Sequence, residues 1–420
     1  MREGNLKTLY VCYFGLREPL VQTQVLSYLR EIKKDGTRVS ILTFEPNPQG
    51  TWTPDEIKTE KEKLAAEGIE WNFLTYHKRP SAPATLYDVL CGAFFIWRKA
   101  RREKLDVIHA RVHTPAMMGA LAKKFMAGRK PKLLFDIRGF FPEEYTDAGV
   151  WKEDGWLYKS VKRIEKWLLK EADGFVVLTE RARGILFPES AENGFDAAGR
   201  PVEVIPCCVD LERFGAATED SRREIRQKLN IGDRFALVYV GSFGGWYLTQ
   251  ETADFYGALK QRKPDAFALI LTQSKPEMIE PLLRARGYTD KDFFIQKVKP
   301  SEIPLYLSAA DAAVSFIKPC YSKQASSPTK NAEYLACGLP LIVNGGVGDT
   351  TELTEADGTG VVIENFSPEG YRNALEKLDK MLEDKAALAE KCRASARKRF
   401  DLFTVGGERY RRLYRNLLQR

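Results

Sequence analysis

Short runs of β-branched and aromatic residues alternate with helical patterns along nearly all of the 420 residues. In the first half these runs predict strands at residues 8–14, 39–44, 70–74, 107–110, 132–137, 174–178 and 202–205. The pattern then restarts and predicts strands at residues 235–240, 266–271, 293–298, 312–316, 339–343 and 360–363. Because strands that alternate with helices form parallel sheets covered on both faces, we predict an α/β chain of two doubly wound units.

The segment Ile205-Pro206-Cys207-Cys208-Val209-Asp210 separates the two sets of strands and predicts a hinge. We therefore expect one Rossmann-like lobe at 1–205, a second at 206–395, and a basic segment at 396–420. Ligands of such sheets bind outside the carboxyl ends of the strands, and a cleft between the lobes is the default site. The chemistry is accordingly expected in the loops that lead from strand to helix.

The charge of the chain is concentrated at one end. Residues 391–420 hold ten basic and two acidic residues, a net charge of +8 that equals the formal charge of the whole chain. A nucleic-acid-binding protein would instead carry its basic residues along a face or groove, so no nucleic-acid partner is expected.

The cysteines and the apolar segments indicate in which cellular compartment the protein is expected. None of the seven cysteines forms a C-x-x-C pair, which predicts a reducing environment without a disulfide framework or a zinc site. The first residues resemble no signal peptide, and no apolar stretch reaches the roughly 20 residues that span a bilayer. We expect a cytoplasmic protein.

The window from Ser326 to Pro340 carries the strongest local signal. Ser327 is predicted to cap a helix whose first residue is Pro328. Lys330 and Glu333 are three residues apart and so share one helix face. Lys330 beside the free N–H groups of a helix start suits a phosphate, and Glu333 suits sugar hydroxyls. The alternative is an ordinary surface ion pair on a capped helix.

Two glycine-rich loops accompany this window, at residues 241–247 and 344–351. Glycines let a backbone approach a ligand closely and turn N–H groups toward an anion, although a tight turn is the alternative. Neither loop is a P-loop, and neither is a clean G-x-G-x-x-G after the first strand of a lobe. Loops of this kind in one lobe favour a nucleotide diphosphate over ATP hydrolysis or NAD binding.

The order S-P-T-K-x-x-E-Y-L-A-C-G-L-P-L-I at 327–342, followed by a glycine loop, resembles the donor site of GT-B glycosyltransferases of the retaining, family-4-like (group 1) branch. The linker from Val204 to Phe214 resembles the segment between the lobes of that family. Looser similarities lie at Val25–Arg30 with Gly36–Val39, at His109–Arg111 and at Phe135–Gly139. The similarity covers nearly the whole chain.

The resemblance implies a nucleotide-diphosphate sugar in the C-terminal lobe, an acceptor (a glycan, a lipid-linked sugar or a small metabolite) in the N-terminal lobe, and a final helix that packs back on the N-terminal lobe. It implies sugar transfer with retention and without a metal or other cofactor, as in polysaccharide or glycoconjugate biosynthesis. The catalytic residues expected from it are Asp136, Arg138, Lys330 and Glu333. The expected donor-binding residues are Gly241, Ser242, Gly244, Val298, Ser326, Ser327, Lys330, Glu333, Gly346, Gly348 and Asp349. The expected acceptor-binding residues are Gly15, His109, Arg111, Arg138 and Glu143.

The chain departs from the family pattern at three places. The family places a glutamate eight positions before the one matched by Glu333, and this chain has Ala325 there. The family often places Arg and Lys after the strand predicted at 235–240, but here Ser242 stands there and no lysine is near Trp246 in the sequence. Many relatives carry a histidine where this chain has Asp136 or Arg138. These departures leave two alternatives open, a sugar-nucleotide 2-epimerase on the same fold and a non-catalytic partner subunit.

Other polar motifs are weaker. His109 and His113 are four apart, but no H-E-x-x-H pattern connects them, so polar contacts near the acceptor are favoured over a metal. Asp290-Lys291-Asp292 resembles a metal-binding D-x-D but precedes a strand, which favours a solvated turn. Asp136, Arg138, Glu143 and Glu144 follow a strand, where they either contact a ligand or brace the loop with a salt bridge.

Residues 86–104 form an apolar and aromatic helical run that ends in basic residues. A core helix with a solvated end is one interpretation. Peripheral contact with the inner face of a membrane, with the basic C-terminal segment contributing, is the other.

Overall fold

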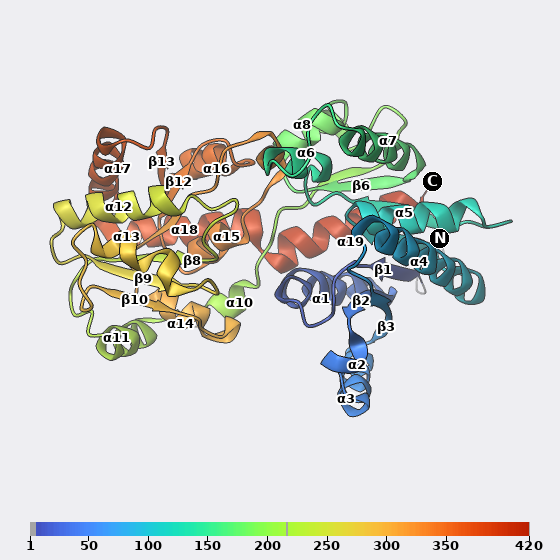
Figure 1. Ribbon diagram of the computed structural model, residues 1–420, viewed down its shortest axis with the longest axis horizontal. Helices are drawn as coiled ribbons and strands as arrows, with labels where there is room; N and C mark the ends of the chain where they lie inside the picture. Colours follow the sequence, from blue (N-terminus) through green and yellow to red (C-terminus); the bar gives the residue numbers. More distant parts are fainter. Residues whose placement is uncertain (1–5, 216, 420) are drawn as a thin grey trace. The chain divides into compact units, whose positions relative to one another are not determined.

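The computed structural model describes residues 6–215 and 217–419, which form two compact units (Figure 1). Unit 1 comprises Met1–Pro206 together with Leu402–Arg420, and unit 2 comprises Cys207–Asp401. The division at Pro206 lies within the segment predicted as a hinge. The basic C-terminal segment is divided between the units, because its first residues continue the last helix of unit 2.

Unit 1 is a parallel seven-stranded sheet in the order β3-β2-β1-β4-β5-β6-β7. Its strands are β1 (Lys7–Val11), β2 (Arg38–Pro46), β3 (Ile69–Tyr76), β4 (Val107–Arg111), β5 (Lys132–Asp136), β6 (Gly174–Val177) and β7 (Val202–Val204). Its helices are η1 (Val21–Val25), α1 (Leu26–Ile32), η2 (Lys33–Asp35), α2 (Pro48–Thr51), α3 (Pro54–Ala66), α4 (Ser81–Glu103), α5 (His113–Lys124), α6 (Phe141–Asp147), α7 (Trp156–Glu171), α8 (Glu180–Leu186), α9 (Ser190–Asn193), η7 (Leu402–Gly407) and α19 (Glu408–Leu418). Strand order reverses direction between β1 and β4, which makes their carboxyl ends the switch point of the sheet.

Unit 2 is a parallel six-stranded sheet in the order β10-β9-β8-β11-β12-β13. Its strands are β8 (Ala236–Val240), β9 (Phe267–Leu271), β10 (Phe293–Gln296), β11 (Ala312–Ser315), β12 (Leu341–Asn344) and β13 (Gly360–Ile363). Its helices are α10 (Leu211–Phe214), α11 (Glu219–Lys228), α12 (Thr249–Arg262), η3 (Pro276–Met278), α13 (Glu280–Arg284), η4 (Pro300–Glu302), α14 (Ile303–Ser308), η5 (Tyr321–Ala325), α15 (Thr329–Ala336), α16 (Thr350–Asp357), α17 (Pro368–Met381), η6 (Leu382–Asp384) and α18 (Lys385–Phe400). The switch point of this sheet lies between β8 and β11. The prediction of two doubly wound α/β lobes is confirmed.

The sheet of unit 2 is covered on both faces, as the continuous apolar character of its strands requires. Helices α11, α14, α15 and α18 pack on one face, where Ile225, Leu307, Ala332 and Leu388 join one hydrophobic cluster. Helices α12, α13 and α17 pack on the other face in a second cluster, and Figure 1 shows α12 and α17 lying together there. Two buried faces leave the ends of the strands as the places where polar chemistry can sit.

Local sequence signals set several helix ends. Thr53 and Glu56 form a capping box at the start of α3, each side chain bonding to the backbone N–H of the other residue. Gly36 ends the first helical segment with φ 78°, a conformation that costs glycine little. Within that segment Val21–Val25 form a π-helix.

The arginines of α19 bond to groups of unit 1 instead of forming a free basic surface. Arg411 pairs with Glu31 and Asp35, Arg415 also pairs with Asp35, and Arg412 pairs with Glu203. Within unit 1 these pairs hold α19 on the rest of the fold. The predicted contribution of these C-terminal arginines to a membrane-binding surface is therefore not supported by their positions.

Candidate functional site

The candidate site of unit 2 lies at the carboxyl ends of β8, β11 and β12. The side-chain amide of Asn344, the last residue of β12, donates to the carbonyl of Ile317 and accepts from its N–H, both at 2.9 Å. These two hydrogen bonds tie the end of β12 to the segment after β11. The loops at 241–248, 316–328 and 345–349 leave the sheet from this edge.

Lys330 occupies the first turn of α15, with its ammonium packed on two aromatic rings. Nζ lies 4.5 Å from the ring centre of Tyr239 and 4.2 Å from that of Tyr247. The side chain is buried, and Nζ has no hydrogen-bond partner among the residues that the structure describes. Burial lowers the pKa of Lys330 to about 7, although Glu333 opposes the shift. A buried cation that lacks an acceptor is well placed to receive an anionic ligand.

Gly241 makes room for this ammonium. Its φ of 139° disfavours any side chain, and a Cβ built there would lie 2.9 Å from Lys330 Nζ. The chain on either side is fixed, since Tyr239 donates its hydroxyl to the carbonyl of Ser242 and Tyr334 accepts from the N–H of Val240 at 2.7 Å. The glycine is therefore required by both the backbone conformation and the close approach of Lys330.

Glu333 lies one helical turn after Lys330 and is half-buried. Burial raises its pKa to about 7, against the opposing effects of Arg213 and Lys330. The alternative of a solvated surface ion pair does not describe this arrangement, because Lys330 is buried and its Nζ makes no hydrogen bond within the described chain. The two side chains form a partly desolvated cation and carboxyl group on one helix face.

The start of α15 differs from the prediction in one respect. Pro328 is the residue before the first helical residue, Thr329, and no side chain caps the helix. Ser327 does not act as the predicted cap, since its Oγ instead accepts a hydrogen bond from the N–H of Cys207 at 3.1 Å. Ser326 precedes it in extended conformation and is half-buried.

The glycine loops contribute fewer free N–H groups than the sequence suggests. Gly241 donates to Leu271, Gly244 to the hydroxyl of Thr249 and Gly348 to the carbonyl of Lys323. The N–H groups of Ser242 and Gly346 make no hydrogen bond to another described residue, and both residues are exposed. Ser242 and Gly346 are therefore among the backbone donors that could contact an anion at this edge.

Two other donor-site predictions, and the departure at Ala325, are placed as follows. Asp349 precedes the first residue of α16 in the loop after β12. Val298 follows β10, the edge strand two places from β8, and packs partly buried against a hydrophobic cluster. Ala325, at the position where the family has glutamate, is buried at the end of η5.

The sequence analysis missed Lys323. Its Nζ lies 4.0 Å from the ring centre of Trp246, and the side chain is buried. Its carbonyl also accepts the N–H of Gly348 at 2.8 Å, so this residue joins the loops after β8, β11 and β12. No lysine is near Trp246 along the chain, yet the fold brings one there. The sequence offers one signal for Lys323, its position in the loop after the strand predicted at 312–316.

In unit 1, three predicted residues gather around Asp136 at the switch point. Nε2 of His109 and Nη1 of Arg111 lie 3.6 and 3.9 Å from Asp136 Oδ2, and Nη1 of Arg138 lies 3.6 Å from Oδ1. Tyr410 of α19 donates to Oδ2 at 3.1 Å. The neighbouring arginines and His109 lower the pKa of Asp136 to about 2, although burial acts in the opposite direction.

Burial limits what this cluster can contact directly. Asp136 and His109 have no exposed surface, and the side chain of Arg111 is 4% exposed. Arg138 follows the strand and reaches Gln24 at 3.5 Å. In this structure Asp136 and His109 can therefore affect a ligand only by positioning the arginines beside them.

The other two acceptor-site predictions lie elsewhere in unit 1. Glu143, on α6, accepts from Tyr158 at 3.0 Å and pairs with Lys162 at 2.9 Å. Gly15 is buried in the loop after β1, where a Cβ would lie 2.9 Å from a carboxylate oxygen of Glu45. The structure thus brings His109, Arg111 and Arg138 together, but not Glu143 or Gly15 with them.

The weaker motifs have structural partners. His113 faces Glu165 at 3.2 Å, away from the partners of His109. Asp292 accepts from the N–H and hydroxyl of Thr289 and pairs with Lys260 at 3.2 Å, as a turn-bracing residue does. Among the residues that the structure describes, no three His, Cys, Asp or Glu side chains are grouped so as to hold a metal ion.

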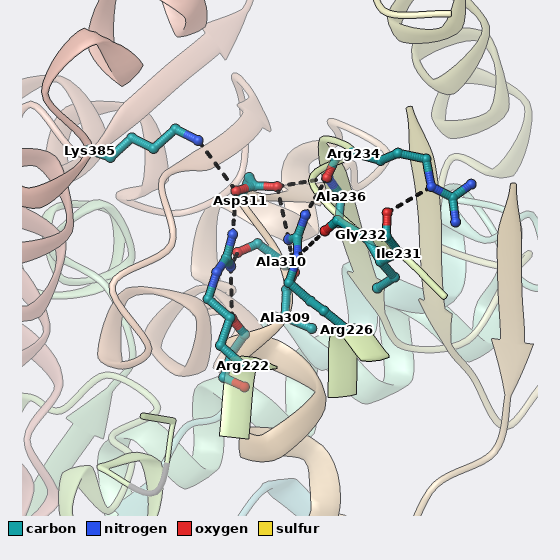
Figure 2. Close-up of polar contacts among 11 residues, drawn as sticks. Arg222, Arg226, Ile231, Gly232, Arg234, Ala236, Ala309, Ala310, Asp311 and Lys385 are labelled. Atoms are coloured by element: carbon teal, nitrogen blue, oxygen red, sulfur yellow. Dashed lines mark hydrogen bonds and ion pairs between the residues drawn. The ribbon is translucent and has the colours of Figure 1, made fainter. Parts of the chain in front are cut away.

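A separate hollow of about 760 Å³ lies at the opposite edge of the unit 2 sheet. Figure 2 shows its centre, where Asp311 at the start of β11 accepts from Arg222 and from the N–H of Ala236, both at 2.8 Å. Arg226 and Lys385 also point to this carboxylate, and both arginines bond to backbone carbonyls of residues 309–310. These groups hold α11 and α18 to the amino ends of the strands, which explains the polar lining without a ligand.

Two family models cover most of the chain. The model described as glycosyl transferases group 1 matches residues 221–399, within unit 2, and glycosyltransferase family 4 matches residues 21–213. A 2-deoxystreptamine glucosyltransferase from Streptomyces kanamyceticus is 28% identical over 159 residues, which are 36% of this chain and only 38% of that relative.

Solved structures share the fold over the full length. A glycosyltransferase from Rickettsia africae has a TM-score of 0.70 at 15% identity, covering 99% of each chain. Anabaena HepE in complex with UDP has a TM-score of 0.67 at 16% identity, covering 98% of this chain and 100% of its own. With a group 1 match on one doubly wound unit and a family 4 match on the other, the chain belongs to the GT-B glycosyltransferases of the group 1 type.

Proposed function

We propose that this protein transfers a sugar from a uridine diphosphate sugar to an acceptor hydroxyl, with retention at the anomeric carbon and without a metal ion. The observation that carries the proposal is the buried ammonium of Lys330, which lacks a hydrogen-bond partner within the described chain at the switch point of unit 2. HepE, a structural neighbour, was solved with UDP and with UDP-glucose, which supports the choice of uridine. Retention is inferred from the family resemblance.

The residues of unit 2 have separate roles in this proposal. The bond from the sugar to the β-phosphate breaks, the acceptor oxygen bonds to the same carbon, and UDP leaves while the hydroxyl proton is released. Lys330 stabilises the negative charge that develops on the diphosphate, with Lys323 and the N–H groups of Ser242 and Gly346 assisting. Glu333 accepts hydrogen bonds from the ribose.

The acceptor is assigned to the carboxyl edge of unit 1. The guanidinium groups of Arg138 and Arg111 lie there, with side chains 6% and 4% exposed, and Asp136 fixes their positions. We propose that Arg138 contacts the acceptor or the transferred sugar, whereas Asp136 is a positioning residue.

The test is calorimetric titration of the purified protein with UDP, GDP, ADP and dTDP, first without added metal and then with EDTA. We expect UDP to bind most tightly, with an affinity that EDTA does not change and that falls at least tenfold in Lys330→Ala. Lys291→Ala is the matched control, because it removes an exposed lysine that precedes β10 at the other edge of the sheet. Failure of all four diphosphates to bind would favour a non-catalytic subunit. Conversion of a single UDP-sugar to its epimer without an acceptor would favour the epimerase.

A further inference from the structure

Helix α4 of unit 1 carries an unusual row of exposed apolar side chains. Leu86, Tyr87, Leu90 and Phe94 are 55–62% exposed, and the helical spacing puts them within one stripe of its surface. The opposite face of the helix is buried, with Val89, Gly92, Ile96 and Ala100 among its members. The stripe is thus additional to the face that α4 needs for packing in unit 1.

The exposed charges on and before the stripe, from Lys78 to Arg102, are all positive, and the acid that follows them, half-buried Glu103, pairs with Arg102 at 2.6 Å. Lys78 and Arg79 precede α4, and Arg98, Arg101 and Arg102 lie in its last turns, and all five are exposed. The single acidic residue between Lys78 and Arg102 is Asp88, which is buried and bonded to Tyr13 and His77. An exposed apolar stripe with basic residues at both ends and no exposed acid between them is complementary to an anionic lipid surface.

The aromatic groups of α4 also suit a membrane interface. The guanidinium of Arg101 lies 5.0 Å from the ring centre of Trp97, so its charge stays near the apolar row. No helix in the described part of the chain is long and apolar enough to cross a bilayer. A helix that lies along the interface, with its packed face still on unit 1, satisfies both observations.

We propose that α4 docks this protein on an anionic bilayer, with Leu86, Leu90 and Phe94 in the acyl boundary and Arg98 and Arg101 at the headgroups. The N-terminal end of α4 lies at the carboxyl edge of the unit 1 sheet, since Tyr87 contacts His77, which follows β3, at 5.2 Å between ring centres. Docking would hold that edge at the lipid surface. The docking itself does not depend on the proposed transfer reaction.

The test is sedimentation of the full chain with vesicles of phosphatidylcholine, with and without phosphatidylglycerol. We expect binding only to the anionic vesicles, weakened by added salt. The double variant L90S/F94S should lower the partition coefficient at least tenfold, and R98S/R101S about thirtyfold at low salt. Trp156→Ser is the matched control, because Trp156 is an aromatic residue even more exposed than the stripe, at 74%, and follows the exposed acids Glu153 and Asp154.

Each contrary outcome overturns the docking. Wild-type protein that stays in the supernatant with anionic vesicles, or L90S/F94S that binds as tightly as wild type, would exclude α4 as the membrane contact. A wild-type dimer that L90S/F94S converts to a monomer in light scattering would assign the stripe to a second copy of the chain. The circular dichroism spectrum and the thermal unfolding of each variant should match those of wild type, which would show that loss of vesicle binding is not loss of structure.

Discussion

The pKa of Lys330 should make the proposed nucleotide binding dependent on pH in a direction that can be calculated. Burial disfavours the charged form and holds the pKa of this lysine at about 7, against an ordinary value of 10.5. A diphosphate beside Nζ should return the pKa toward its ordinary value. The binding of UDP is then coupled to the uptake of a proton above pH 7.

The magnitude follows from the two values. Between pH 7 and pH 9 the protonated fraction of free Lys330 falls from about one half to about one hundredth, so the UDP affinity should weaken about fiftyfold. The phosphate oxygens contribute little over this range, because a terminal phosphate with a pKa near 6 is already ionised. At pH 8 the binding of each UDP should take up about 0.9 proton.

The assay is calorimetry in pairs of buffers that differ in their enthalpy of ionisation, which measures affinity and proton uptake together. Lys330→Arg is the critical variant, because a guanidinium keeps its charge and should give an affinity that does not change between pH 7 and pH 9. Glu333→Gln should keep the fall, which separates the lysine from the carboxyl group whose pKa is also near 7. A wild-type affinity that is constant with pH, or an arginine variant with the wild-type slope, would refute the assignment of Lys330 to the diphosphate.

Three further predictions concern single residues. Gly241→Ala, with φ 139° and a Cβ 2.9 Å from Lys330 Nζ, should weaken UDP binding at least tenfold in calorimetry while the protein stays folded; unchanged affinity would contradict the close packing. Glu333→Ala should weaken UDP about tenfold but leave pyrophosphate binding unchanged, and equal losses for both would exclude the ribose role. Asp136→Asn should lower the free energy of unfolding of unit 1 by about 3 kcal/mol in urea. The folded pKa of Asp136, about 2, lies below its ordinary 3.8, so wild type should lose about 2.4 kcal/mol of stability as pH falls from about 5 to about 1, and the variant should not.

The sequence predicted the strands well because most of them are buried on both faces. Every predicted strand is present, with ends that shift by at most a few residues, as at 8–14 against β1, Lys7–Val11. Continuous apolar runs between glycine and polar turns leave little choice of register. The π-helical turn at Val21–Val25 has no signal in the sequence, because its apolar spacing does not differ clearly from that of an α-helix.

The site was predicted only where its residues are neighbours in the chain. Lys330 and Glu333 share one helical turn, so their common face follows from their spacing. The position of Asp136 depends on Tyr410, 274 residues later, and no local pattern shows that this hydroxyl closes over the carboxylate. Predicted groups at the end of β5 thus proved to be buried partners of one another, which only the packing of α19 could reveal.

The departures from the family pattern have a structural explanation in unit 2. The loop after β8 lacks the basic pair that the resemblance implies, and Ala325 replaces a glutamate. Lys323, two residues before that alanine, lies under the ring of Trp246 from the same β8 loop, so a cation from the segment after β11 occupies the neighbourhood that the β8 loop leaves without one. A glutamate at 325 would be a buried carboxylate two residues from this lysine, and the alanine found there avoids burying that charge. If unit 2 holds the diphosphate as proposed, the changes at 242 and 325 are better understood together, as a relocation of positive charge from the β8 loop to the segment after β11, than as two independent losses.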